Sequence, residues 1–142
     1  MTNDIQIFTP DLSTEIRLPY FDIGIPAGFP SPAQDYIEGD LDLNKELIQN
    51  KAATFCARVG GDSMEPLMHY GDLVIVDRSL DPFDQCIAVC LLDDGFTIKR
   101  LDMKEKGVVR LIPENPRYPI ETVNSDTNFQ IWGIVKAVIH KT

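Results

Sequence analysis

The residues best suited to chemistry lie in the segment Gly60-Gly61-Asp62-Ser63-Met64-Glu65-Pro66. An apolar strand is expected to end before it, and its two glycines allow a close approach of the backbone. Ser63 stands where a short helix is expected to begin. The N–H groups there lack intrahelical partners, so those of Asp62 and Ser63 could stabilise an oxyanion beside an attacking hydroxyl. Ser63 could equally be only the N-cap of that helix, and the segment alone leaves both interpretations open.

A nucleophilic serine needs a base, and the two histidines are the first candidates. His69 follows Ser63 closely in the chain, and His140 lies next to the C-terminus. A histidine-based triad also needs an orienting carboxylate, and nothing in the sequence singles one out. Both histidines are therefore interpreted as surface residues.

A lysine is the alternative base. Lys99 lies in Phe96-Thr97-Ile98-Lys99-Arg100-Leu101, where strand alternation puts Thr97, Lys99 and Leu101 on one face. Loss of hydration beside apolar neighbours would favour a neutral amine that can accept a proton. A solvated lysine on a strand is the more common situation, and the alternation by itself favours it.

The elements that must position these residues are predicted to be mostly β-strands, because short apolar segments alternate with turn residues. Asp93-Asp94-Gly95 is typical of a hairpin turn. A short helical segment precedes the strands: Ser31 and Gln34 fit a capping box, and Leu43, Leu47 and Ile48 share one helical face. Gly39-Asp40 is expected to interrupt it. The predicted strands cover residues 54–59, 72–77, 86–92, 96–103, 108–114 and 129–139.

Residues 1–30 differ from the rest of the chain. They contain Pro10, Pro19, Pro26 and Pro30 and show no sustained periodicity, which indicates an extended arm. Its apolar residues partly alternate, so the arm can dock along a sheet or another chain. Within residues 25–30, the small residues Ala27 and Gly28 lie between two prolines, which indicates a flexible stretch.

Composition restricts the class of protein. The 142 residues carry a net charge of −9, with no basic stripe and no helix-turn-helix pattern, so no autonomous binding to duplex DNA is expected. The N-terminus lacks the features of a signal peptide, and no apolar run is long enough to span a bilayer, so we expect a cytoplasmic protein. Cys86 and Cys90 could be a metal pair, but they are interpreted as small core thiols without a metal.

The combination of Ala27-Gly28, Gly61-Asp62-Ser63-Met64 and the Lys99 strand resembles the LexA/UmuD family of self-cleaving serine/lysine proteases. The similarity extends over nearly the whole chain. It includes the stretches GFPSPAQDYIE (28–38), DLNKELIQ (42–49), GDLVIVD (71–77), LIPEN (111–115) and WGIVKAVI (132–139).

This resemblance implies a mostly β catalytic fold with a short helical segment and an extended N-terminal arm. It implies that Ser63 is the nucleophile, Lys99 the neutral general base, and the N–H groups of Asp62 and Ser63 the oxyanion donors. The bond between Ala27 and Gly28 would be cut, separating an arm (1–27) from a helical lead-in and catalytic domain (28–142). No cofactor is implied.

The resemblance also implies partners: a homodimer, stimulation by RecA filaments on single-stranded DNA, and an UmuC-type Y-family polymerase that takes up the cut product for damage-tolerant synthesis. The chain departs from many UmuD-type proteins in carrying Ala-Gly at the cut instead of Cys-Gly, and Gly60 precedes Gly61. Two rival functions are a non-catalytic interaction module that acts through the arm, and a signal-peptidase-like enzyme, which would need a membrane anchor. A full repressor would need an operator-binding domain.

Overall fold

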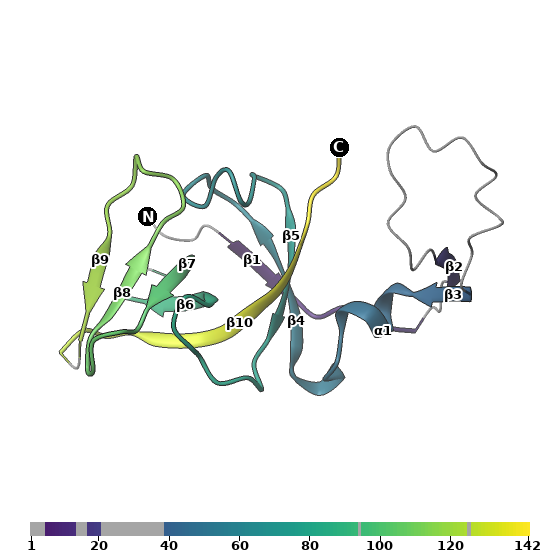
Figure 1. The fold of residues 1–142 in the computed structure, drawn as a ribbon, viewed down its shortest axis with the longest axis horizontal. Coiled ribbons are helices and arrows are strands. Elements are labelled where there is room, and N and C mark those ends of the chain that lie inside the picture. Colours follow the sequence, from purple (N-terminus) through teal and green to yellow (C-terminus); the bar gives the residue numbers. More distant parts are fainter. Residues whose placement is uncertain (1–4, 14–16, 21–38, 94, 125) are drawn as a thin grey trace. The chain divides into compact units, whose positions relative to one another are not determined.

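The computed structural model describes residues 5–13, 17–20, 39–93, 95–124 and 126–142, and it confirms a mostly β fold (Figure 1). These residues form two compact units, one containing residues 1–10 and 50–142, the other residues 11–49. The expected cut at Ala27-Gly28 and the capping box at Ser31 lie outside the described residues, as does Asp94 of the predicted turn.

The larger unit contains an eight-stranded antiparallel sheet in the order β1-β4-β5-β10-β6-β7-β8-β9. Its β-branched segments suit a pleated surface that is buried on at least one side. The sheet curls, so that its first strand β1 comes into contact with β7 (Figure 1). The strands are β1 Ile5–Phe8, β4 Thr54–Val59, β5 Leu73–Asp77, β6 Ile87–Leu92, β7 Gly95–Asp102, β8 Val109–Ile112, β9 Glu121–Val123 and β10 Gln130–Ile139.

The long strand β10 joins the two halves of this sheet. Its C-terminal part pairs with β5 and its N-terminal part with β6, and the register shifts once in each stretch. Gly133 lies at one shift, where an added Cβ would be 2.6 Å from Val76 Cγ1. A glycine is therefore required where the two strands approach closely.

Two apolar clusters form the core. The first includes Met64 and Met68, which belong to the loop that follows β4, together with Ile98 of β7. The second lies among β6, β7, β8 and β9 and includes Cys86 and Cys90, which are 3% and 0% exposed. All three cysteines are free thiols, so the interpretation of this pair as core residues is confirmed.

In the smaller unit, the described residues form a two-stranded sheet and a short helix. Strand β2 (Arg17–Tyr20) pairs with β3 (Gly39–Asp42) in an antiparallel register, so Gly39-Asp40 is not helical, while the helical segment expected before it lies outside the described residues. The helix α1 (Leu43–Leu47) then begins at Asp42, whose carboxylate accepts a hydrogen bond from the Asn44 N–H at 3.0 Å. The N-cap places the helix start after the strand. A 3₁₀ turn at Lys51–Ala53 precedes β4.

The predicted strands are confirmed in position, with ends that differ by a few residues. The sequence did not indicate β1, β2, β3 or the three-residue β9 as strands. The short helix expected at Ser63 is instead a series of turns between β4 and β5. Its backbone bonds include those from Glu65 N–H to the Asp62 carbonyl and from Met68 N–H to the Met64 carbonyl, which are too few for a continuous helix.

Candidate active site

Ser63 and Lys99 are brought together by the curled sheet. Ser63 lies in the loop that follows β4, Lys99 in the middle of β7, and Lys99 Nζ is 3.0 Å from Ser63 Oγ. Their exposed fractions are 7% and 6%. The solvated strand lysine that alternation alone favoured is therefore not what the structure shows. Both faces of β7 are covered here, since the adjacent Ile98, whose side chain points to the opposite face, is also buried.

Thr97 also positions the amine. Its hydroxyl oxygen lies 2.7 Å from Lys99 Nζ, and the Ile98 carbonyl accepts a hydrogen bond from the same nitrogen at 3.1 Å. Thr97 is 2% exposed. The alternation of β7 predicted that Thr97 and Lys99 share a face, but it did not predict that they touch. Lys99 itself is 6% exposed, so its amine contacts protein oxygens more than solvent.

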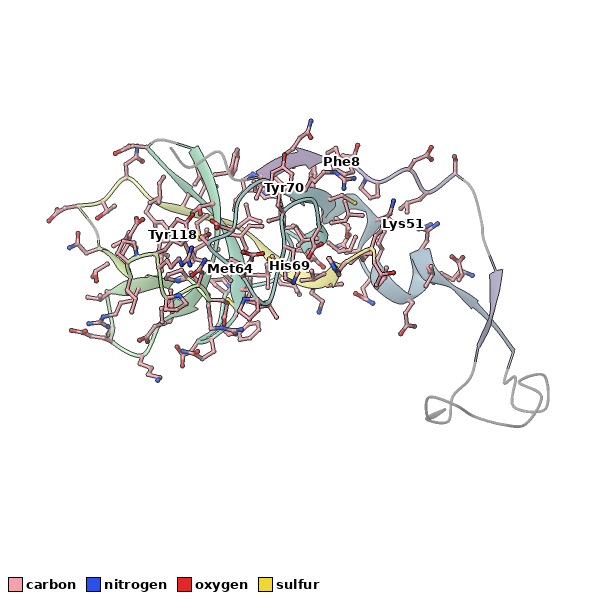
Figure 2. All side chains as sticks on the ribbon, turned by 90° about the horizontal axis from the view of Figure 1, so that it is seen from above. Phe8, Lys51, Met64, His69, Tyr70 and Tyr118 are labelled. Atoms are coloured by element: carbon pink, nitrogen blue, oxygen red, sulfur yellow. The ribbon has the colours of Figure 1, made fainter. Side chains whose placement is uncertain are left out.

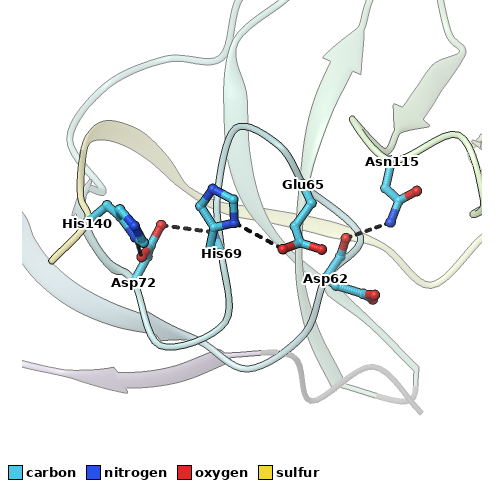
Figure 3. Close-up of polar contacts among 6 residues, drawn as sticks. All are labelled: Asp62, Glu65, His69, Asp72, Asn115 and His140. Atoms are coloured by element: carbon cyan, nitrogen blue, oxygen red, sulfur yellow. Dashed lines mark hydrogen bonds and ion pairs between the residues drawn. The ribbon is translucent and has the colours of Figure 1, made fainter. Parts of the chain in front are cut away.

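The loop of residues 113–118 forms hydrogen bonds to the backbone around Ser63. Asn115 Nδ2 donates a hydrogen bond to the Asp62 carbonyl at 3.0 Å, and the Asn115 N–H donates to the Ser63 carbonyl at 3.0 Å (Figure 3). The Tyr118 hydroxyl donates to the Asp62 carboxylate. Sequence reasoning missed Asn115 and Tyr118, because only the stretch LIPEN and no spacing rule pointed to this loop.

Arg100 connects this loop to the strand that carries Lys99. Arg100 Nε is 2.6 Å from Glu114 Oε1, and its Nη1 donates to the Gln85 carbonyl at 2.7 Å. Adjacent residues of a strand point to opposite sides. Lys99 therefore reaches Ser63, while Arg100 fastens the residue next to Asn115. One strand thus fixes both the amine and the loop that orients the serine backbone.

The two histidines lie together at the surface. Their side-chain hydrogen-bond partners are carboxylates, not Ser63 or Lys99. Their ring centroids are 4.9 Å apart, His69 Nδ1 lies 3.0 Å from Glu65 Oε1, and His140 Nδ1 lies 2.5 Å from Asp72 Oδ1 (Figure 3). Their side chains are 43% and 52% exposed, so their interpretation as surface residues is confirmed.

Ser63 is among the residues that line a small apolar cavity. This cavity is lined by Ile5 of β1, Val59 of β4 and Ile98 of β7, and by Gly61, Ser63, Met64 and Met68 of the loop. A small apolar side chain suits such a surface. Within the described ranges, no group of three or more His, Cys, Asp or Glu side chains is placed to hold a metal ion. No helix in that part of the chain has the length and apolar character to cross a membrane.

Comparisons with known proteins identify the family. Residues 19–136 match the model of the Peptidase S24-like family. The chain is 46% identical to Protein SamA of Salmonella typhimurium over 87% of this chain and 86% of that protein. It is 38% identical to Protein MucA of Salmonella typhimurium over 92% and 90% of the two chains. It is 33% identical to the LexA repressor of Paracidovorax citrulli, over 83% of this chain and 52% of the repressor. The chain therefore belongs to the Peptidase S24-like family, and within it to the LexA/UmuD group of self-cleaving serine proteases of the SOS response.

Proposed function

We propose that the chain cuts its own peptide bond between Ala27 and Gly28, with Ser63 as nucleophile and Lys99 as general base. The observation that carries this proposal is the 3.0 Å approach of Lys99 Nζ to Ser63 Oγ in a buried setting. A neutral amine at this distance can accept the hydroxyl proton. Family membership supports the same chemistry.

The proposed reaction has two stages. Lys99 takes the proton from Ser63 Oγ, and the oxygen attacks the Ala27 carbonyl carbon. The backbone N–H groups of Asp62 and Ser63 stabilise the resulting oxyanion. The C–N bond then breaks, and the protonated Lys99 returns its proton to the nitrogen of Gly28. Water, deprotonated by the same amine, hydrolyses the ester between Ser63 and Ala27 and releases residues 1–27 from residues 28–142.

A substrate that belongs to the same molecule has a high effective concentration, so encounter does not limit the reaction. Two conformational controls are proposed. The bond occupies the site only part of the time, and the bound segment completes the exclusion of water from Lys99, which favours the neutral amine. An activator that binds the cleavable state more tightly shifts both equilibria. We propose RecA filaments on single-stranded DNA for this role.

The proposed biological outcome is a switch. Residues 28–142 form a homodimer and join an UmuC-type Y-family polymerase for DNA synthesis past lesions in the SOS response. The family and its relatives support a role in SOS mutagenesis. The rival function, a non-catalytic interaction module that acts through the arm, predicts the same fold but no fragment beginning at Gly28.

The test is self-cleavage of the full-length protein across a pH series, followed by intact mass. A fragment starting at Gly28 should form faster as the pH rises, because Lys99 loses its proton. Ser63→Ala should abolish it, and Lys99→Arg should lower the rate about a thousandfold, since a guanidinium cannot act as the base. Lys104→Ala, at an exposed lysine near the end of the same strand, is the matched control.

Cleavage by Ser63→Ala, or a rate that does not depend on Lys99, would exclude the mechanism. A second series with RecA, ATP and single-stranded DNA tests the activator. If the fragment forms at high pH and the complete mixture does not accelerate it near pH 7, the proposal for RecA is wrong and the one for the catalytic pair stands.

A further inference from the structure

Strand β1 belongs to the catalytic sheet although it lies in the arm that the proposed cut removes. Residues 5–8 pair with β4 in an antiparallel register, with Ile5 opposite Val59 and Phe8 opposite Cys56. The first ten residues belong to the same compact unit as residues 50–142. The arm is therefore not merely a substrate segment, because its start completes one edge of the sheet (Figure 1).

The side chains of β1 alternate between core and solvent. Ile5 is 9% exposed and belongs to the core cluster that contains Val59, Met64 and Met68, and Ile7 packs against the same cluster. Gln6 and Phe8 point outward, and Figure 2 shows Phe8 at the outer edge of this unit. This is the pattern by which an extended peptide adds to a sheet edge: main-chain hydrogen bonds along the strand, and alternate side chains in apolar positions.

The position of the cut determines what happens to this strand. The bond between Ala27 and Gly28 lies outside the described residues, at a position in the sequence between β1 and β4. Cutting it breaks the covalent path between β1 and β4 but leaves every contact between these two strands in place. The removal of β1 is therefore a separate physical step from the cut.

We propose that the outer edge of β4, with the apolar floor formed by Val59, Met64 and Met68, is a strand-acceptor site whose occupant is the chain's own residues 5–8, held without a covalent link after the cut. This inference rests on the proposed cut at Ala27-Gly28. The cut product is then a two-piece complex. Only dissociation of the fragment exposes the edge of β4, the apolar floor and the cavity beside Ser63.

A full-length variant allows this proposal to be tested independently of self-cleavage. The variant combines Ser63→Ala with a recognition sequence for an added protease between Ala27 and Gly28, so that an external enzyme makes the cut. The cut protein is passed over a gel-filtration column at about 10 μM, a concentration at which a weak peptide–protein complex of micromolar affinity persists. Residues 1–27 should elute with residues 28–142. The amides of β4 that face β1 should keep their protection from hydrogen exchange.

Ile5→Asp should release the fragment, because it puts a carboxylate into the apolar floor, and the dissociation constant should rise at least about tenfold. Gln6→Asp, at the neighbouring outward position, is the matched control and should retain the fragment. Circular dichroism of each intact chain before the cut separates loss of the fragment from loss of the fold. Free elution of residues 1–27 from the parent chain, or equal retention in Ile5→Asp and Gln6→Asp, would overturn the proposal.

The two proposals fail in different ways. If the fragment is retained here but the chain with Ser63 never cuts itself, the strand-acceptor site stands and the catalytic proposal is wrong. If the chain cuts itself but the externally cut fragment elutes free, the catalytic proposal stands and retention is wrong.

Discussion

At the scale of single residues, the orientation of the Ser63 peptide depends on a side chain from a distant loop. Asn115 donates a hydrogen bond to the Asp62 carbonyl, which belongs to the peptide group that also carries the Ser63 N–H. Because this group is planar and trans, a fixed carbonyl directs its N–H to the opposite side. Asn115 is thus a positioning residue for a proposed oxyanion donor, and it acts without touching the reacting bond.

Asn115→Ala should lower the rate of self-cleavage about tenfold. This is a smaller effect than the loss of an oxyanion donor, because the Ser63 N–H remains and only the hydrogen bond that orients its peptide group is removed. The pH at which the rate is half-maximal should not move, since Lys99 keeps its contacts. The rate of fragment formation across a pH series measures both quantities. Asn128→Ala, which removes an exposed amide bonded to Asp93, is the control. An unchanged rate, or a shifted midpoint with an unchanged maximum, would show that Asn115 does not act in this way.

The burial of Lys99 and the contacts of Asn115 could not be predicted from local sequence patterns. The glycines before Ser63 and the alternation around Lys99 are visible in the sequence. They left two alternatives undecided: Ser63 as a nucleophile or an N-cap, and Lys99 as a base or a solvated lysine. The burial of Lys99 comes from a loop 36 positions earlier in the chain, which is a tertiary effect that local alternation does not contain. The resemblance to a family paired Ser63 with Lys99, and the structure brings these two side chains to 3.0 Å of each other, while their catalytic roles stay a proposal. Asn115 had no local signal, because an amide in a loop bonds to whatever carbonyl the fold brings near.

At the scale of elements, Asp72 connects the loop after Ser63 to the end of β10. It is 3% exposed and accepts hydrogen bonds from the His69 N–H at 2.8 Å and from His140 Nδ1 at 2.5 Å (Figure 3). Burial acts to raise the pKa of this carboxyl, but the hydrogen bonds to His140 and His69 outweigh it and hold the pKa below its ordinary value of 3.8. The ionised carboxylate is thus the form that the fold prefers.

Asp72→Asn should therefore destabilise the protein at pH 6 by about 1.5–3 kcal/mol, the range for hydrogen bonds to a charged group. A lowered pKa contributes stability that is present above the pKa of the unfolded chain and is lost as the pH falls through the folded value. The difference from the parent should therefore shrink below about pH 3.8. Urea unfolding at pH 6 and pH 3 measures it. The exposed Asp81→Asn is the control, and a difference that stays constant with pH would contradict the assignment.

Gly133 sets the fit of β10 against β5. An alanine methyl there would meet Val76 Cγ1 at 2.6 Å and Arg78 Cγ at 3.2 Å, so the strands would have to shift. Gly133→Ala should lower the free energy of unfolding by about 1–3 kcal/mol, as overpacking does. Lys136→Ala, at an exposed position of the same strand, should change it by less than about 0.5 kcal/mol. Thermal unfolding measures the stability of both variants. If Gly133→Ala is as stable as the parent chain, the strands can move apart without loss of free energy and the prediction of overpacking is wrong.

At the scale of the whole molecule, the longer strands of the large sheet were predictable but the order of the strands was not. Apolar runs and turns located β4 to β8 and β10, since these signals are local. The insertion of β10 between β5 and β6 depends on contacts between distant segments. Strand β1 was predicted only as an arm able to dock, because four residues without turn signals do not specify a partner. The edge that it completes is visible only in the folded sheet.

Net charge is a property of the whole chain, and it restricts how the proposed activator, a RecA filament on single-stranded DNA, can bind. With 13 Lys and Arg against 22 Asp and Glu, the net charge of −9 opposes close approach to a polyanion. We therefore expect contact with RecA protein and not with DNA. At about 50 mM salt, where phosphate contacts are strongest, neither duplex nor single-stranded oligonucleotides should bind full-length Ser63→Ala below about 10 μM in fluorescence anisotropy. With the parent chain, single-stranded DNA alone should leave the cleavage rate unchanged, while RecA, ATP and that DNA together should raise it. Acceleration by DNA alone, with a steep dependence on salt, would mean that the basic residues gather into a surface strong enough to overcome the overall charge.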